Sequence, residues 1–393
     1  MRIERAVILA AGEGQRLRPF TVLKPKVMIP IANKPILQYV VEALAANGVR
    51  HIAMVVGYKK EQVQDYFGSG EKHGVEIDYI VQKQQLGTAH ALLQARDMVG
   101  DRFLVLPGDN IIEANTIAPL VEAKPSIILV KKQANISKYG VVTVRRRMIE
   151  DIMEKPHETA SRLVNTGIYA LNRDVFEFMD GETELPTVLR NMIGRGSKIA
   201  AQETEDTWLD AVYPWDILRL NDVALSSISS GIAGTVEKGV TIKGAVCIGR
   251  GTVIRAGCYL VGPLIIGENS EIGPYTCLFP ATSIGDYVTI SPFSNIRNSA
   301  IGNGVRIGPG STLEDSIIDR GSVIGGHFSA YGGKAVIEVE GEYHTVDTGV
   351  VVGEYCAIGN NVIARSGVIL GNLSKIDTLN VLSGKIPDQS LVM

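Results

Sequence analysis

Two glycines and an arginine directly follow the first apolar run of the chain, and residues of these types can bind phosphate. Residues 9–16 read LAAGEGQR, so Gly12 and Gly14 precede Arg16. Glycines let backbone N–H groups approach an anion closely, and a nest of such groups favours phosphate without a formal charge. A tight turn in any sheet uses the same Gly-x-Gly pair, so the pair alone leaves both interpretations open.

A second basic motif sharpens the phosphate interpretation. Lys24-Pro25-Lys26 lies eight to ten residues after Arg16, and further prolines follow at Pro30 and Pro35. Each proline fixes its own φ, so these prolines restrict the path on which the lysines are displayed. Lysines held in this way have less freedom to point into solvent. This favours phosphate binding over the alternative that they are ordinary solvent-exposed charges.

The elements that position these motifs alternate between strands and helices. The patterns predict strands at 6–9, 51–56, 77–81 and 103–106, and helices at 36–44, 61–67 and 88–97. Such alternation is typical of a parallel sheet covered on both faces, whose ligands bind at the carboxyl ends of the strands. Loops 10–19 and 107–110 follow strands in that position. We therefore predict an α/β, Rossmann-like doubly wound domain over residues 1–227.

From position 236 the pattern changes to a period of six. Aliphatic residues occupy every sixth position from 236 to 296, and after a one-residue slip the period resumes at Ile301 and continues toward the C-terminus. This period is the signature of hexapeptide repeats, which form a parallel β-helix with three strands per coil. We predict a left-handed β-helix over 228–393, interrupted by a protrusion at 330–349. The small residues of 226–235 form the expected domain boundary.

Composition limits the partners and the location. The chain has 393 residues, 39 Lys and Arg against 42 Asp and Glu, and a formal charge of −3. This balance argues against a nucleic-acid-binding domain, and no apolar run reaches the roughly 18 residues that span a bilayer. The N-terminus lacks the apolar stretch of a signal peptide, so we expect a cytoplasmic protein. The 4 cysteines are scattered and are expected to be structural thiols.

The string LAAGEGQRLRP followed by KPK resembles the signature of the sugar-1-phosphate nucleotidylyltransferases. The resemblance covers about residues 1–225 and extends into the hexapeptide region. There the chain is similar to the archaeal-type bifunctional N-acetylglucosamine-1-phosphate uridylyltransferases/glucosamine-1-phosphate acetyltransferases and to glucose-1-phosphate thymidylyltransferases. The resemblance implies an enzyme that converts an NTP and a sugar 1-phosphate to an NDP-sugar and pyrophosphate.

That reaction joins two anions, so its site needs positive charge and a metal ion more than it needs a covalent nucleophile. The resemblance implies that Arg16 binds the triphosphate and that Lys26 stabilises the charge that develops on the α-phosphate. Mg²⁺ is a hard ion held by one or two carboxylates, and Asp109 and Asp210 match them. Singly, each aspartate is more often a cap or turn residue.

The resemblance also assigns the substrate contacts. The predicted nucleotide-binding residues are Ala10, Ala11, Gly12, Gly14, Gln82, Gly87 and Thr88, and the predicted sugar-phosphate-binding residues are Gly140, Glu154, Lys155 and Asn165. Gln82 and Gly87 match a pair that reads a pyrimidine base through a side-chain amide and a backbone amide. The choice between UTP and dTTP, and between glucose 1-phosphate and N-acetylglucosamine 1-phosphate, stays open.

The repeat domain has two interpretations. It is either an acetyl-CoA-dependent sugar-amine acetyltransferase, with His327 as general base, or a structural device for assembly. Both interpretations predict a homo-oligomer, a trimer or a multiple of one. His344 is expected at the surface. An alternative for the whole chain is a non-catalytic regulatory or scaffold subunit with the same two modules. The joint presence of Arg16, Lys26, Asp109 and Asp210 favours the enzyme.

Overall fold

The computed structural model describes residues 2–134, 136, 138–154, 156 and 161–393, and the chain forms two compact units. Unit 1 comprises Met1–Glu13 and Ile36–Asp210, and unit 2 comprises Gly14–Pro35 and Ala211–Met393. Segment 14–35 therefore packs with the C-terminal part of the chain, although it carries two of the predicted catalytic residues. The division at 227/228 stays a prediction about the sequence modules.

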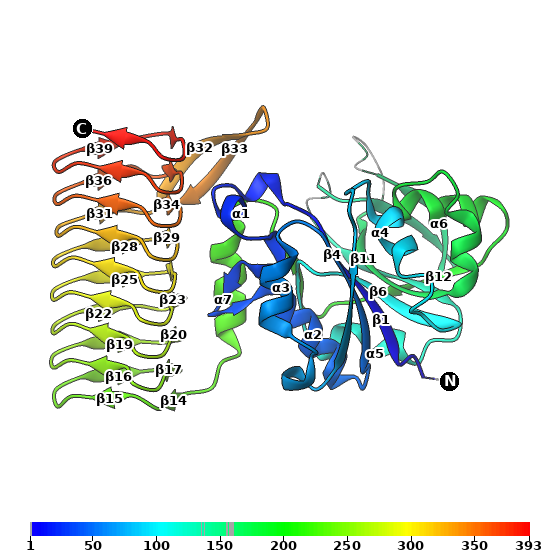
Figure 1. The fold of residues 1–393 in the computed structure, drawn as a ribbon, viewed down its shortest axis with the longest axis horizontal. Helices are drawn as coiled ribbons and strands as arrows, with labels where there is room; N and C mark the ends of the chain where they lie inside the picture. The colour runs from blue at the N-terminus through cyan, green and yellow to red at the C-terminus, as the bar shows by residue number, and fades with distance from the viewer. Residues whose placement is uncertain (1, 135, 137, 155, 157–160) are drawn as a thin grey trace. The chain divides into compact units, whose positions relative to one another are not determined.

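Unit 1 is built on one nine-stranded sheet in the order β5-β4-β1-β6-β11-β8-β12-β10-β9 (Figure 1). Its strands are β1 (Arg5–Ala10), β4 (His51–Val56), β5 (Glu76–Val81), β6 (Arg102–Pro107), β8 (Ser126–Lys132), β9 (Val141–Arg145), β10 (Met148–Met153), β11 (Leu163–Asn172) and β12 (Ile199–Glu203). Its α-helices are α2 (Ile36–Ala46), α3 (Lys60–Phe67), α4 (Thr88–Gln94), α5 (Ala114–Val121) and α6 (Leu185–Gly194). The predicted strands and helices up to residue 106 are confirmed in type and place.

The sheet is mixed, which corrects the expectation of a wholly parallel one. β1 runs parallel to β4 and β6, but β11 is antiparallel to both β6 and β8. β9 and β10 form a hairpin that pairs in antiparallel fashion as well. The short connection between β9 and β10 forces antiparallel pairing in that hairpin, and the helical crossovers of the first half allow parallel pairing. β11 instead pairs with strands that are not its neighbours in the chain.

One face of the sheet is covered by α4 and α6. Leu92 of α4 and Leu189 of α6 are buried in one apolar cluster with Val7, Val55 and Val105 of the central strands. These three strand residues occupy successive parallel strands, and their side chains point to the same face. The carboxyl ends of the same strands carry the loops described below.

Unit 2 contains a stack of short parallel strands in three sheets of nine, nine and eight strands. Successive strands go to the three sheets in turn, from β14 (Gly231–Ile232), β15 (Thr235–Val236) and β16 (Thr241–Lys243) to β39 (Val381–Leu382), β40 (Lys385–Ile386) and β41 (Leu391–Val392). We call this part the coil stack. Its strand order is consistent with the predicted hexapeptide β-helix.

The period of six forms the interior of the coil stack. The aliphatic positions from Ile248 to Ile296 are at most 2% exposed and belong to one apolar cluster. Ile248 pairs with Ile266, and Ile266 pairs with Ile284, so residues three hexapeptides apart lie directly above one another. Cys258 and Cys356 are buried in the same cluster, as expected for packing residues.

The predicted protrusion is a hairpin of β32 (Gly333–Val339) and β33 (Glu342–Thr348). The stack continues beyond it, because β34 (Val351–Val352) pairs with β29 (Ile317–Ile318). Figure 1 shows this hairpin projecting from the coils. The hairpin therefore adds a charged arm to unit 2 without breaking the ladder.

The other elements of unit 2 come from segment 14–35 and from the chain before the stack. They are the 3₁₀ turns η1 (Gln15–Leu17) and η2 (Lys26–Met28), helix α1 (Phe20–Leu23), the two-residue strands β2 (Pro30–Ile31) and β3 (Lys34–Pro35), and helix α7 (Asp216–Ser226). α7 packs on β23 (Thr282–Ile284) and β26 (Ala300–Ile301) of the stack.

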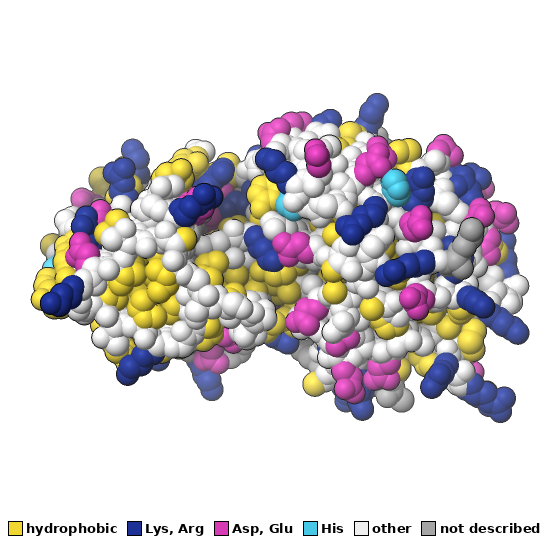
Figure 2. Space-filling model, turned by 90° about the horizontal axis from the view of Figure 1, so that it is seen from below, with side chains coloured by type: hydrophobic (Ala, Val, Ile, Leu, Met, Phe, Trp, Pro, Cys, Tyr) yellow, Lys and Arg dark blue, Asp and Glu magenta, His cyan; other side chains and the backbone are white. Residues whose placement is uncertain are grey.

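The first coil of the stack exposes apolar surface. Ile232 is 56% exposed, and Val236 and Ile242 are only partly buried. Figure 2 views the molecule from the side on which the first coil lies, and hydrophobic side chains gather there over the stack. Within the part of the chain that the structure describes, no helix has the length and apolar composition needed to cross a membrane.

Candidate active site

The loop after β1 starts the candidate site in unit 1. Ala10 and Ala11 are buried, and the Ala11 carbonyl accepts a hydrogen bond from the Tyr58 N–H at 3.2 Å. A Cβ added to Gly12 would have no atom within 4 Å, so the backbone there is open on that side. The Gly108 N–H donates to the Leu9 carbonyl at 2.9 Å. This bond holds the loop that carries Asp109 beside the end of β1.

Two short strands bring the predicted metal ligands together. β7 (Asn110–Ile112) pairs in antiparallel fashion with β13 (Trp208–Asp210), and Asn110 lies opposite Asp210. Asp109 directly precedes Asn110, so the two aspartates lie on neighbouring backbone segments. The Oδ1 atom of Asn110 is buried and has no hydrogen-bond partner among the described residues. This set of oxygen donors fits Mg²⁺, which prefers carboxylates and other oxygen ligands.

A tyrosine that the sequence analysis did not select orients one of these carboxylates. The Tyr139 hydroxyl donates to Asp210 Oδ1 at 2.8 Å, and the Tyr139 ring packs against Trp208 with centroids 5.4 Å apart. Tyr139 directly precedes Gly140, so the signal that could have found it was its place in an already selected string. Trp208 is 3% exposed and is a core residue.

The two residues predicted to read the base contact each other. Gln82 follows β5, is 4% exposed, and donates through Nε2 to the Gly87 carbonyl at 3.2 Å. The same Nε2 lies 2.9 Å from Nδ1 of His90. An amide NH₂ group only donates, so His90 Nδ1 accepts in this contact. Gln82 therefore turns its Oε1 acceptor away from both partners, and His90 is an orienting residue that sequence analysis missed.

Gly87 and Thr88 are fixed against the start of α6. Gly87 has φ 129°, and a Cβ there would lie 2.4 Å from the Thr183 carbonyl oxygen. The Thr88 hydroxyl donates to Glu184 Oε2 at 2.9 Å and accepts from the Leu185 N–H at 2.8 Å. Only glycine allows this close approach, and the Thr88 side chain serves to hold the turn.

Three of the predicted sugar-binding residues lie together. A Cβ on Gly140 would approach Glu154 Oε2 to 2.8 Å and Asn165 Cβ to 3.8 Å. Asn165 is buried, with Nδ2 donating to the Tyr169 hydroxyl at 2.9 Å and Oδ1 accepting from the Gly167 N–H at 3.0 Å. Burial raises the pKa of Tyr169, which keeps its hydroxyl neutral. Lys155 lies outside the described residues.

In unit 2, segment 14–35 brings Gly14 and Lys26 into contact. Gly14 has φ 81°, and a Cβ there would lie 2.9 Å from Lys26 Cβ, so a larger residue would displace the lysine. Arg16 lies in η1 and pairs with Glu340 at the tip of the β32–β33 hairpin, with Nε and Oε2 2.6 Å apart. This hydrogen bond raises the pKa of Arg16. The pair is half-exposed.

The two histidines of the repeat region differ in their surroundings. His327 lies at an exposed corner of the coil stack with φ 56°, and its ring covers Gly310 of the preceding coil. His344 was expected at the surface, but its side chain is only 20% exposed. Its ring packs on Tyr213 and Trp215, with centroids 4.4 and 5.7 Å apart, because the hairpin folds onto the residues before α7.

Comparison with known proteins identifies both modules. The nucleotidyl transferase family model matches residues 5–223, and the bacterial transferase hexapeptide model, with its six repeats, matches residues 281–315. Both matches agree with the patterns found in the sequence.

Individual relatives span both modules. The chain is 40% identical over 260 residues to the bifunctional protein GlmU of Methanococcus maripaludis, a match of 64% of this chain and 61% of that relative. It is 34% identical to a bifunctional sugar-1-phosphate nucleotidylyltransferase/acetyltransferase of Sulfurisphaera tokodaii (73% of each chain). It is 32% identical to a glucose-1-phosphate thymidylyltransferase of Streptomyces antibioticus (73% and 84%).

A solved structure resembles part of the chain. The structure of a UDP-glucose pyrophosphorylase complexed with UDP-glucose aligns with a TM-score of 0.52 and 26% identity. The alignment covers 57% of this chain and 100% of that one. The likeness therefore concerns about half of the present chain.

Proposed function

The chain belongs to the nucleotidyl transferase family, and on that premise we propose that it transfers a nucleotidyl group from UTP or dTTP to a hexose 1-phosphate. The products are an NDP-sugar and pyrophosphate. The sugar is glucose 1-phosphate or N-acetylglucosamine 1-phosphate. Two of the relatives described above are named as transferases, so they give no support to the alternative of a non-catalytic subunit.

The observation that carries the proposal is the β7–β13 pairing, which aligns Asn110 with Asp210 and so brings Asp109 near it. Nucleotidyl transfer requires a divalent cation at the phosphates, and these residues are the ones that would hold Mg²⁺. When bound, the ion would neutralise charge on the triphosphate. Tyr139 would keep the Asp210 carboxylate in one orientation through its hydrogen bond.

The chain's cations have separate tasks in this reaction. An oxygen of the sugar phosphate attacks the α-phosphorus, a new P–O bond forms, and the bond to the departing pyrophosphate breaks. Arg16 would bind the β- and γ-phosphates, because its planar guanidinium can donate two hydrogen bonds to one phosphate. Lys26 would place its ammonium at the α-phosphate, where negative charge develops in the transition state.

We expect the base specificity to follow from the orientation of Gln82. Its Oε1 acceptor can receive the N3–H of uracil or thymine, whereas cytosine presents an acceptor at N3. CTP should therefore show kcat/KM at least about 100-fold below that of UTP or dTTP, because a mismatch leaves buried polar groups unpaired. UTP and dTTP differ by one methyl group, worth about 1–3 kcal/mol.

The test is pyrophosphate release with UTP, dTTP, CTP, ATP and GTP, each with glucose 1-phosphate and N-acetylglucosamine 1-phosphate. Release with no pair of substrates would refute the proposed reaction. Use of purine nucleotides alone would contradict the role of Gln82 and leave the reaction class standing.

Glu340 should weaken the binding of the NTP, because its carboxylate pairs with the Arg16 guanidinium and competes with the phosphates for it. A half-exposed ion pair is worth about 0–1 kcal/mol, so Glu340→Gln should lower the KM for the NTP by up to about 5-fold and leave kcat unchanged. Initial rates over a range of NTP concentrations measure this effect. A matched control is Asp347→Asn, an exposed carboxylate on the same hairpin, and equal effects of the two variants would contradict a specific role of Glu340.

For the coil stack we propose the left-handed sense of a hexapeptide β-helix and assembly into a trimer or a multiple of one. The exposed apolar side chains of the stack support burial against other copies. The relative from Sulfurisphaera tokodaii is named as an acetyltransferase as well, which supports an acetyl-CoA-dependent activity, for which His327 stays the predicted base. The cytoplasmic location also stays a prediction.

A further inference from the structure

Lys24 lies two residues before Lys26 and has an unusual environment for a lysine in a surface motif. It is 6% exposed, and its Nζ lies 2.8 Å from both carboxylate oxygens of Asp319 and 2.9 Å from Oε1 of Glu354. Asp319 directly follows β29 and Glu354 follows β34, which are neighbouring strands of one sheet of the coil stack. The lysine is therefore inserted between two coils.

The charges around Lys24 are balanced. Glu354 is fully buried, and its second oxygen, Oε2, accepts from Arg320 Nε at 2.7 Å. Two cations thus face two carboxylates. Burial by itself lowers the pKa of Lys24, but Asp319 and Glu354 outweigh it and raise the pKa. The ammonium is therefore charged at neutral pH, and withdrawing it would leave two buried carboxylates with only Arg320.

Further contacts fix the backbone on both sides of Lys24. Asn372 Nδ2 of the stack donates to the Pro19 carbonyl at 2.9 Å. Asn33 Nδ2 of the segment donates to the Ile284 carbonyl at 2.6 Å. Asn221 of α7 accepts from the Ala32 N–H at 3.0 Å. Each of these amide side chains bonds to one specific backbone group. The bonds therefore fix the position of segment 14–35 along α7 and the coil stack.

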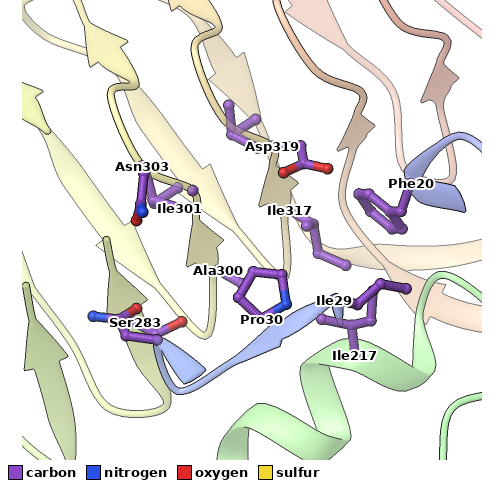
Figure 3. Close-up of a pocket in the computed structure, with 13 residues that line it drawn as sticks. Phe20, Ile29, Pro30, Ile217, Ser283, Ala300, Ile301, Asn303, Ile317 and Asp319 are labelled. Atoms are coloured by element: carbon purple, nitrogen blue, oxygen red, sulfur yellow. The ribbon is translucent and has the colours of Figure 1, made fainter. Parts of the chain in front are cut away.

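Apolar side chains also pack between segment 14–35, α7 and the coil stack, where they line a pocket. Phe20, Ile29 and Pro30 of the segment line it together with Ile217 of α7, Ile317 and Asp319. Figure 3 shows these side chains between the blue strand of the segment, the green helix and the strands of the stack. Phe20 is 2% exposed.

We infer that Lys24 is a positioning residue for nucleotidyl transfer, and that the coil stack serves this reaction by holding the loop that carries Arg16 and Lys26. Only Pro25 separates Lys24 from Lys26, and Gly14 packs directly on the Lys26 side chain. An anchor at Lys24 therefore restricts the ammonium of Lys26. This inference rests on the proposed function. It assigns the coil stack a task in the first reaction, separate from assembly or acetyl transfer.

The test uses Lys24→Met in the full chain. We expect kcat for pyrophosphate release to fall by about 10- to 100-fold, because small misplacements of a catalytic group cost that much, while the KM for the sugar 1-phosphate changes little. Lys24→Arg keeps the charge and should recover much of the rate. The control is Arg255→Met, which removes a cation between Glu237 and Glu271 on the stack and should leave kcat unchanged.

Hydrogen exchange gives a second readout that does not depend on activity. In Lys24→Met the amides of residues 14–35 should exchange at least about 10-fold faster, and those of the coils around Ile266 should not change. If Lys24→Met unfolds, the triple variant Lys24→Met, Asp319→Asn, Glu354→Gln removes the uncompensated charges. Arg320 can then face solvent, since its side chain is 45% exposed.

The outcomes separate the two proposals. A wild-type protein that releases no pyrophosphate refutes the proposed function, and the exchange experiment still decides whether Lys24 anchors the segment. An active wild-type protein with unchanged kcat in Lys24→Met, or in a folded triple variant, overturns the inference. So does unchanged exchange over residues 14–35.

Discussion

Lys26→Ala should lower kcat for pyrophosphate release by about 100-fold or more, the largest effect expected from a single side chain of this protein. An ammonium held at the α-phosphate stabilises charge that appears only in the transition state, so its loss affects kcat more than KM. The lysine begins η2 and packs on Gly14, which leaves its backbone little freedom. Steady-state assays with saturating NTP and sugar 1-phosphate measure the effect.

Lys34→Ala is the matched control for Lys26→Ala. Lys34 lies in the same segment, on β3, and belongs to none of the predicted binding groups. Lys34 is partly buried. We expect its kcat to stay within about 2-fold of the wild type, because this ammonium is assigned to no phosphate. Lys26→Arg should restore only part of the rate, because a planar guanidinium does not replace a point charge. An Lys26→Ala variant with wild-type kcat would exclude the role assigned to this residue.

The second large effect is expected for Asp210→Asn. Removing one carboxylate from a two-carboxylate site should raise the Mg²⁺ concentration needed for half-maximal rate by about 10- to 100-fold, and excess Mg²⁺ or Mn²⁺ should restore part of the activity. The amide keeps the size of the side chain and can still accept from the Tyr139 hydroxyl. Titration of the rate with each metal, at fixed substrate concentrations, tests this.

Two comparisons make the result specific. Asp206→Asn changes an exposed carboxylate four residues upstream and should leave the metal requirement unchanged. Tyr139→Phe removes the hydrogen bond to Asp210, keeps the carboxylate, and should give a smaller shift in the same direction. An Asp210→Asn variant whose rate is indifferent to added metal would remove Asp210 from the metal site.

Local patterns in the sequence determine the two modules. The coil stack follows from a period of six, because a strand of two or three residues and a corner repeat in every hexapeptide. Each aliphatic residue thus reaches the interior by contact with neighbouring coils alone. The strands and helices up to residue 106 follow from local periodicity in the same way. The residues around Gly12, Gly14 and Lys26 are recognised as a string for the same reason.

Only the tertiary structure decides which distant residues meet. The mixed sheet depends on β11, whose antiparallel pairing with β6 and β8 is not encoded in its own apolar pattern. The pairing of Asn110 with Asp210, the Arg16–Glu340 pair and the burial of Lys24 all join residues far apart in the chain. In the sequence, Lys24 is one more charge in a basic motif. Its partners at Asp319 and Glu354 become neighbours only when the coils stack and segment 14–35 packs on them, because a charge is buried only where the fold supplies its counter-charges.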